Sequence, residues 1–150
     1  MRLAIFILMG MLLLPFGTVC ADRGGQTYGN VEGAIYRDNY DGDTIRFDIP
    51  GVHPLLGENI PVRVRGVDAP EIRAQCPEEK ERAMRAKAMV REQLSKATRI
   101  TLIEVGRDKY FRIVARVVAD GVDVGEMLIG AGLAVPYNGG TKTMGWCTTP

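Results

Sequence analysis

The chain has 150 residues, enough for one domain with a hydrophobic core, and its formal net charge is only +1. That balance excludes attraction of nucleic acid by gross charge, so any such binding requires local clusters of Lys and Arg. A zinc site is not expected, because His53 is the only histidine and the three cysteines form no Cys-x-x-Cys pair.

Residues 1–21 are predicted to be a secretory signal peptide. Met1-Arg2 is a short positive start, an apolar run extends to Phe16, and Val19-Cys20-Ala21 ends in small residues that suit cleavage. An uncleaved membrane anchor is the alternative, because the apolar stretch is just long enough to span a bilayer. Cleavage removes Arg2 and no acid, which leaves 18 basic and 18 acidic side chains. We therefore expect an exported protein, periplasmic or secreted, without stable membrane association once the signal is removed.

Signal cleavage also removes one of the three cysteines and leaves Cys76 and Cys147. An even pair in an exported protein predicts a disulfide, and two separate thiols are the alternative. The bond would close a loop of roughly 70 residues and stabilise the fold by about 4 kcal/mol through chain entropy. It would tie the C-terminal tail, residues 138–150, to the loop that follows Glu71.

The hydrophobic pattern divides the remaining chain into strands and two helices. Residues 22–30 are polar and Gly-rich and are interpreted as a flexible lead-in. A helix is predicted over 77–94, where apolar residues recur at helical spacing, and a second one begins with a capping-box-like sequence at Asp123 and ends near Gly132. Alternating apolar and polar residues predict strands over 31–37, 44–49, 60–67, 99–105 and 112–119.

This order of elements predicts the fold class. Three strands, a helix, two strands and a helix suit an α+β, mainly β architecture: the five-stranded Greek-key barrel of the OB type, with helices after the third and fifth strands. We expect this domain to occupy residues 31–137. Such barrels commonly present a face that binds nucleic acid, but the fold alone does not assign a function.

The first acidic segment is Asp41-Gly42-Asp43-Thr44. It is not an EF-hand, because the glycine spacing would place Arg37 at the first calcium-ligating position. Asp41 and Gly42 are typical turn residues, whereas Asp43 begins a strand and can project into the mouth of a barrel. Taken alone, this segment is better explained as a structural turn.

The second acidic segment, Asp68-Ala69-Pro70-Glu71, follows a strand that carries Arg63. Pro70 fixes the exit of the chain, so one acid could hold a metal ion while the other takes a proton from water. Two solvated acids and a solvated strand arginine are the alternative. Arg112 begins a later strand, and its alternative is a surface pair with Asp108.

Together these segments resemble the thermonuclease family, the staphylococcal-nuclease-like domain. The resemblance covers residues 31–137 and rests on the Asp-Gly-Asp-Thr turn, the Arg-x-x-x-x-Asp-x-Pro-Glu segment and the Asp-Lys-Tyr-x-Arg segment at 108–112. It implies an OB barrel that hydrolyses phosphodiester bonds of DNA or RNA with Ca²⁺ as cofactor. We accordingly expect a thermonuclease-like endonuclease that acts as a monomer on a nucleic-acid substrate.

The resemblance also implies a role for each motif residue. The calcium ligands would be Asp43, Asp68 and the backbone carbonyl of Ala69. Glu71 would activate or position the attacking water, and Arg63 and Arg112 would hold the phosphate and neutralise charge in the transition state. Tyr110 would lie near the bound nucleotide.

Two positions depart from the family pattern. Ala69 lacks the hydroxyl of a family threonine but keeps the carbonyl, and Phe111 replaces a small glycine just before the last arginine, which puts the turn that aims Arg112 in question. The main alternative function is an exported OB-fold module that binds nucleic acid without cutting it, which requires stacking aromatic side chains and a basic groove. A disulfide-stabilised structural domain is the third possibility and needs none of the acids.

Overall fold

The computed structural model describes residues 26–141 and 145–147, so the signal peptide predicted over 1–21 lies outside the described residues. The helices are α1 (Pro54–Gly57), α2 (Pro77–Lys96) and α3 (Val124–Gly130). The strands are β1 (Val31–Glu32), β2 (Ile35–Asn39), β3 (Thr44–Asp48), β4 (Ile60–Val64), β5 (Val67–Asp68), β6 (Ile100–Arg107), β7 (Ile113–Ala119), β8 (Val122–Asp123) and β9 (Val135–Pro136).

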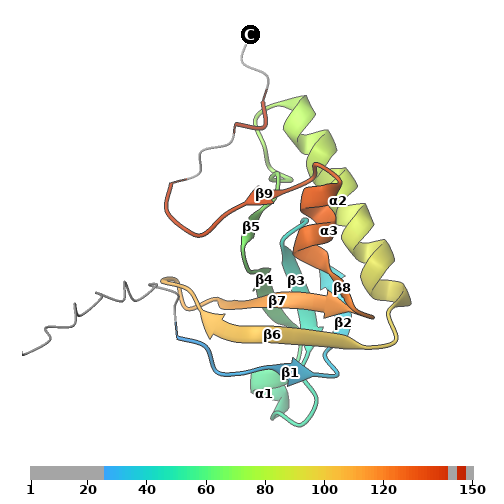
Figure 1. The fold of residues 1–150 in the computed structure, drawn as a ribbon, viewed down its shortest axis with the longest axis vertical. Helices are drawn as coiled ribbons and strands as arrows, with labels where there is room; N and C mark the ends of the chain where they lie inside the picture. The colour runs from blue at the N-terminus through green and yellow to red at the C-terminus, as the bar shows by residue number, and fades with distance from the viewer. Residues whose placement is uncertain (1–25, 142–144, 148–150) are drawn as a thin grey trace, which may run out of the picture.

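A curved sheet forms the body of the molecule, with α2 and α3 packed together beside it (Figure 1). Its strand order is β1-β6-β7-β4-β3-β2, with β8 added to β7, while β5 and β9 form a separate pair. β4 and β7 are parallel, and the other neighbours are antiparallel. This mixed, mostly β half-barrel confirms the predicted OB-like fold class.

The first predicted strand, 31–37, is divided in the structure. Gly33 adopts a φ of +70°, a conformation that glycine reaches without strain, and the chain bends there between β1 and β2. β1 then pairs with β6, whereas β2 pairs with β3. The two halves of one segment therefore lie at opposite ends of the strand order, which is how the sheet curls toward closure.

The two longer helices follow the sequence pattern closely, whereas the short α1 lies in a segment, 50–59, that the sequence indicates as a loop. α2 buries four apolar side chains at helical spacing and lies against β2 and α3: Ala83, Ala86, Val90 and Leu94. The Asp123 carboxylate accepts a hydrogen bond of 3.1 Å from the Glu126 N–H and so caps α3, as the sequence indicates. α3 ends at Gly130, slightly before Gly132, whose φ of +66° turns the chain away.

One core lies between the sheet and the two longer helices. Its largest fully buried side chains include Phe47, Ile45, Leu94, Leu102 and Leu128. Every one of these lies in a strand or helix, so the apolar faces of those elements are held together by burial away from water. Among the described residues, no helix combines the length and the apolar character needed to cross a bilayer.

The two ends of the domain are also tied to its body. The predicted disulfide between Cys76 and Cys147 is present and joins the tail to the start of α2. Nearby, the Arg82 guanidinium lies 6.0 Å from the centre of the Trp146 ring. Within the predicted lead-in, the Tyr28 N–H donates to the Val105 carbonyl at 2.7 Å, so pairing along β6 continues before β1.

Candidate active site

The turn between β2 and β3 holds two buried acids in fixed positions. The Asp41 carboxylate accepts hydrogen bonds from the N–H groups of Asp43 (3.1 Å) and Thr44 (2.8 Å), which closes the turn. The buried Asn39 amide donates to the Asp41 carbonyl at 2.8 Å and to the Lys87 carbonyl of α2 at 3.1 Å. The turn is therefore fastened both to itself and to the helix beside it.

Position 42 in this turn has room only for glycine. A Cβ atom at this position would lie 2.9 Å from the Ala86 Cβ and 3.0 Å from the Ala69 Cβ, closer than side-chain carbons normally approach. The close approach brings the turn against α2 on one side and against the chain after β5 on the other. Glycine at 42 thus sets the depth at which Asp43 is buried.

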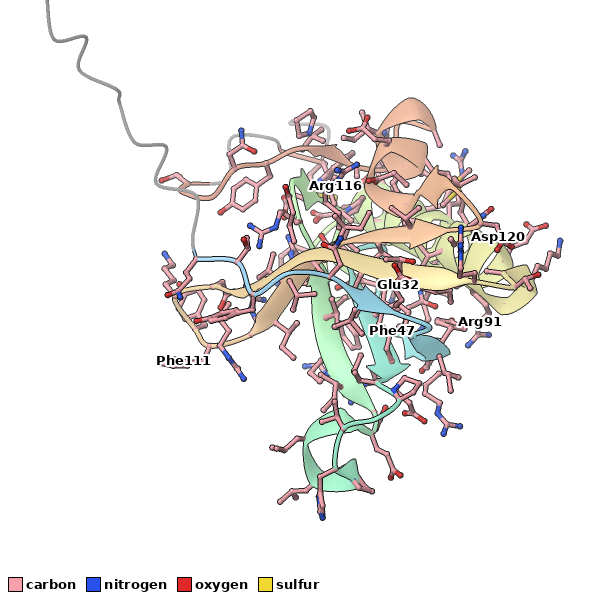
Figure 2. All side chains as sticks on the ribbon, turned by 60° about the horizontal axis from the view of Figure 1, so that its bottom comes forward. Glu32, Phe47, Arg91, Phe111, Arg116 and Asp120 are labelled. Carbon is pink, nitrogen blue, oxygen red and sulfur yellow. A yellow bond between two sulfur atoms is a disulfide. The ribbon has the colours of Figure 1, made fainter. Side chains whose placement is uncertain are left out.

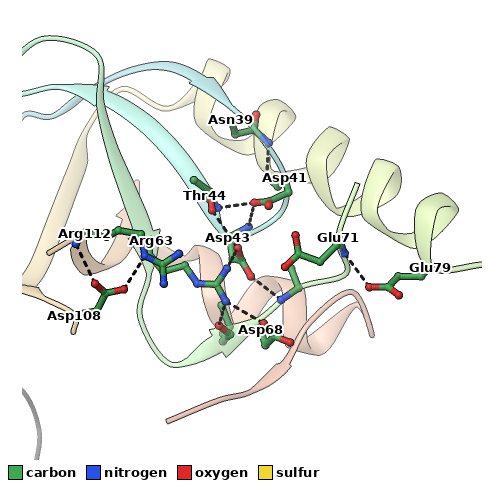
Figure 3. Close-up of polar contacts among 12 residues, drawn as sticks. Asn39, Asp41, Asp43, Thr44, Arg63, Asp68, Glu71, Glu79, Asp108 and Arg112 are labelled. Atoms are coloured by element: carbon green, nitrogen blue, oxygen red, sulfur yellow. Dashed lines mark hydrogen bonds and ion pairs between the residues drawn. The ribbon is translucent and has the colours of Figure 1, made fainter. Parts of the chain in front are cut away.

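Arg63 joins the two acidic segments (Figure 3). Its Nη1 donates to Asp43 Oδ1, and its Nη2 donates to Asp68 Oδ1 at 3.0 Å. The Ala69 N–H donates to Asp43 Oδ2 at 2.7 Å, which adds a direct link between the segments. Four of the residues assigned from the sequence are therefore brought together: Asp43, Arg63, Asp68 and Ala69.

Strand register explains the meeting of these residues. Thr44 pairs with Arg63 across β3 and β4, and the Asp43 carbonyl accepts from the Val64 N–H at 2.8 Å. Beyond β4 the chain turns at Gly66, where φ is +81°, and enters β5 with Asp68 buried. Arg63 lies on β4 and reaches both acids. Asp43 directly precedes β3, the strand that pairs with β4, and Asp68 follows β4 after the turn.

The Glu71 loop approaches the same centre from the side of α2. Figure 3 shows the Glu71 side chain extending from its loop toward Asp43. The Glu71 N–H donates to Glu79 Oε1 at 3.1 Å, and Glu79 lies in the first turn of α2 next to the disulfide. The helix and the disulfide together fix the backbone from which the Glu71 carboxylate projects.

Arg112 and Tyr110 lie on the hairpin between β6 and β7. Arg112 Nε donates to Asp108 Oδ2 at 2.7 Å, and its guanidinium carbon lies 5.6 Å from the centre of the Tyr110 ring. Arg63 pairs with Val114, so Arg112, two residues before Val114, falls on the same face of the sheet as Arg63. The arginines share a face, but Asp108 holds one of them and the buried acids hold the other.

The buried acids create an electrostatic imbalance. Asp41, Asp43 and Asp68 are each at most 4% exposed, and all the buried acids in the described part of the chain belong to this centre. The pKa of Asp43 is raised to about 7. Burial is the main cause, and the charges of Asp41 and Asp68 add to it, although Arg63 and the Ala69 N–H oppose the shift. Three carboxylates beside one guanidinium leave an excess of negative charge.

This excess and the donor atoms fit a divalent cation. A hard cation such as Ca²⁺ prefers carboxylate and carbonyl oxygens, and Asp43, Asp68 and the Ala69 carbonyl offer that set on adjoining segments. A doubly charged ion would also balance the charges of Asp41 and Asp68, which add to the effect of burial on the pKa of Asp43. Asp43 and Asp68 supply two side-chain ligands, so the third ligand would be the backbone carbonyl. In the described residues, three ligand-type side chains come close together at Cys76, Glu79 and Cys147 alone, and there the two thiols are joined in the disulfide.

Sequence reasoning assigned no site role to three residues that shape this centre. Asp41 was treated as a turn residue, yet its carboxylate is buried and raises the pKa of Asp43. Glu79 holds the backbone of Glu71, and Asp108 orients Arg112. The Asp-Gly-Asp spacing was a signal for Asp41, whereas no local pattern marks Glu79, eight residues from its partner.

Comparison with known proteins assigns the chain to a family. A family model described as a staphylococcal nuclease homologue matches residues 61–144, more than half of the 150-residue chain. The match includes Arg63, Asp68, Glu71 and Arg112, and begins after the turn that carries Asp43. No curated protein matches the chain.

Proposed function

The chain belongs to the staphylococcal nuclease family, and from this premise we propose that it is an exported, calcium-dependent nuclease that hydrolyses phosphodiester bonds of DNA or RNA. The observation that carries the proposal is the contact of Arg63 with both Asp43 and Asp68 at one buried centre. A purely structural barrel gains little from such a cluster, because buried charges are expensive to desolvate.

In this proposal each side chain has a distinct task. Asp43, Asp68 and the Ala69 carbonyl would hold calcium, which when bound supplies a Lewis acid that polarises the phosphate. Glu71 orients the attacking water and accepts its proton. Arg63 and Arg112 donate hydrogen bonds to phosphate oxygens and offset the negative charge that grows in the transition state.

The proton acceptor can be tested with Glu71→Gln, which keeps the size of the side chain and removes its basicity. We expect kcat on labelled DNA and RNA to fall by roughly 10²- to 10⁴-fold. The free energy of unfolding should stay within about 1 kcal/mol of the wild type, since the side chain keeps its size and is only partly buried. Glu58→Gln, a matched change at an exposed acid after α1, should leave both quantities unchanged. Wild-type turnover in Glu71→Gln would contradict the assigned role.

The calcium requirement has a readout that does not depend on turnover. Calcium should raise the melting temperature of the wild type, because an ion that binds only the folded state stabilises it by mass action. Asp68→Asn should lose that rise, and a chelator should stop cleavage by the wild type. Binding of labelled DNA without any shortening in calcium would instead support the alternative, a non-catalytic nucleic-acid-binding module.

Export and a monomeric state are further parts of the proposal. Expression of the full chain should yield a mature protein that begins near Asp22, recovered from the periplasm or the medium as a single-chain species. N-terminal sequencing and size-exclusion chromatography with light scattering measure both properties. An intact N-terminus in the membrane fraction would favour the uncleaved anchor.

A further inference from the structure

The β6–β7 hairpin has a turn in which one position strongly favours glycine. The Phe111 N–H donates to the Asp108 carbonyl and the Asp108 N–H donates to the Arg112 carbonyl, both at 3.0 Å. This arrangement is a four-residue turn whose last residue adopts the left-handed conformation, where glycine is the usual choice. Here that residue is Phe111, with a φ of +63°. A residue with a Cβ atom is strained in that conformation, and a bulky one is a clear outlier.

Packing does not compensate for this strain. Phe111 is 77% exposed, so its ring contributes little burial to the fold. Figure 2 shows it at the free end of the hairpin, away from the core. An isolated exposed aromatic ring is ordinary, and so is an occasional positive φ, but the two together leave Phe111 with a cost and no structural benefit. Residues of this kind are often retained for binding or catalysis.

The hairpin holds Phe111 in a defined position. Asp108 Oδ1 accepts from the N–H groups of Tyr110 (2.8 Å) and Arg112 (3.0 Å). On the other side, Arg107 Nη1 donates to the Phe111 carbonyl at 2.7 Å. These contacts fix the backbone on both sides of the ring, so presenting it to a ligand costs little additional ordering.

The two aromatic rings of the hairpin differ in what covers them. Lys109 Nζ lies 5.1 Å and the Arg112 guanidinium carbon 5.6 Å from the centre of the Tyr110 ring. Within residues 26–141 and 145–147, no cation or second ring is placed over Phe111. Phe111 therefore presents an open aromatic face beside Arg107, Lys109 and Arg112, a combination that suits a ligand with both a flat ring and a negative charge.

We propose that Phe111 stacks on an unpaired nucleobase of the substrate strand, adjacent to the phosphate that Arg112 holds. The inference rests on the proposed nuclease function and narrows its substrate to nucleic acid with a single-stranded segment at the cleavage site. In a duplex each base is already stacked and paired, so its ring is not available to Phe111.

The test measures binding, with cleavage slowed by Glu71→Gln in all variants. The probe is a fluorescein-labelled single-stranded DNA hexamer in calcium, read by fluorescence anisotropy, and the comparison probe has the same backbone with abasic sites. Phe111→Ala and Phe111→Gly should each weaken binding of the hexamer by roughly tenfold, and Phe111→Trp should restore it. None of them should change binding of the abasic strand. Leu55→Ala removes a comparably exposed apolar side chain, 82% exposed on α1, and should leave both affinities unchanged.

Thermal unfolding adds a readout in the opposite direction. Phe111→Gly relieves the left-handed strain and should raise the melting temperature by a few degrees while it weakens binding. Unchanged affinity for the hexamer in Phe111→Ala, or an equal loss for the abasic strand, would overturn the inference. Cleavage by the parent protein tests the nuclease function separately. If the parent protein cleaves DNA but substitutions at Phe111 do not affect binding, the stacking role of Phe111 is wrong and the nuclease function stands. If binding depends on Phe111 but the parent protein does not cleave, the nuclease function is wrong and the stacking role stands.

Discussion

Arg63 and Arg112 are assigned the same chemistry, but the structure places them in opposite surroundings. The Arg63 side chain is 14% exposed and bonds to two buried carboxylates. The Arg112 side chain is 52% exposed and bonds to Asp108 on its own hairpin. Both present a guanidinium on one face of the sheet, yet of the two only Arg63 offsets the charge of buried carboxylates.

The difference teaches that burial determines whether a functional charge also supports the fold. A buried charge that loses its partner keeps its desolvation cost, so removal of one member of a buried cluster destabilises the protein strongly. An exposed ion pair is weakened by solvent and contributes at most about 1 kcal/mol. A substitution of Arg63 should therefore lower both stability and activity, whereas a substitution of Arg112 should lower mainly activity.

The largest expected effect is that of Arg63→Ala. It leaves Asp43 and Asp68 without their shared guanidinium, and should lower the free energy of unfolding by about 3–5 kcal/mol. It should also lower kcat by roughly 10²- to 10³-fold through the loss of one charge-stabilising donor. Urea denaturation and steady-state kinetics measure the two losses. Stability equal to that of the wild type would show that the buried acids do not depend on Arg63.

Arg112→Ala should separate the two properties. We expect a similar fall in kcat, roughly 10²- to 10³-fold, because the same kind of phosphate contact is lost. The free energy of unfolding should fall by no more than about 1 kcal/mol, since the pair with Asp108 is half exposed. Arg112→Lys keeps the charge but not the planar fork, and should recover only part of the activity. A large loss of stability in Arg112→Ala would remove the contrast with Arg63.

The sequence predicted well what depends on local pattern. α2 was expected over 77–94 and spans Pro77–Lys96, because its apolar residues recur at helical spacing. The capping residue Asp123 was identified from four adjacent residues. The division of the first strand was missed: Gly33 was visible, but whether it bends a strand depends on which neighbours the two halves find.

The convergence of the candidate site was not accessible from local pattern. It depends on the pairing of Thr44 with Arg63 and of Asp68 with Val135, which join segments that are far apart in sequence. The resemblance to a family supplied the residues, and the fold supplies the physical reason for their meeting. The burial of Asp41 also depends on packing against α2, so its influence on Asp43 could not be inferred from a turn motif.

The smallest expected effect concerns Asp108, whose carboxylate accepts the hydrogen bonds that hold the exposed β6–β7 hairpin. Partial burial alone would raise the pKa of Asp108, but hydrogen bonds from the Arg112 side chain and from the N–H groups of Arg112 and Tyr110 outweigh it and lower the pKa. A carboxyl group with a lowered pKa stabilises the folded state above its unfolded pKa, about 4, and loses that contribution as the pH falls through its folded value. Asp108→Asn should therefore be slightly less stable than the wild type at pH 7 and equal to it in strong acid.

The same substitution shows whether the hairpin orients Arg112 or merely carries it. If Asp108 is a positioning residue, Asp108→Asn should lower kcat several-fold at pH 7 with little change in KM, because the Arg112 contact is strongest in the transition state. Asp108→Glu keeps the charge and should restore part of the activity. If Asp108→Asn lowers the stability but leaves kcat unchanged, Arg112 does not need Asp108 to contact the phosphate. Arg112 would then differ from Arg63 in two respects: its contribution to stability, and its independence of a carboxylate that orients it.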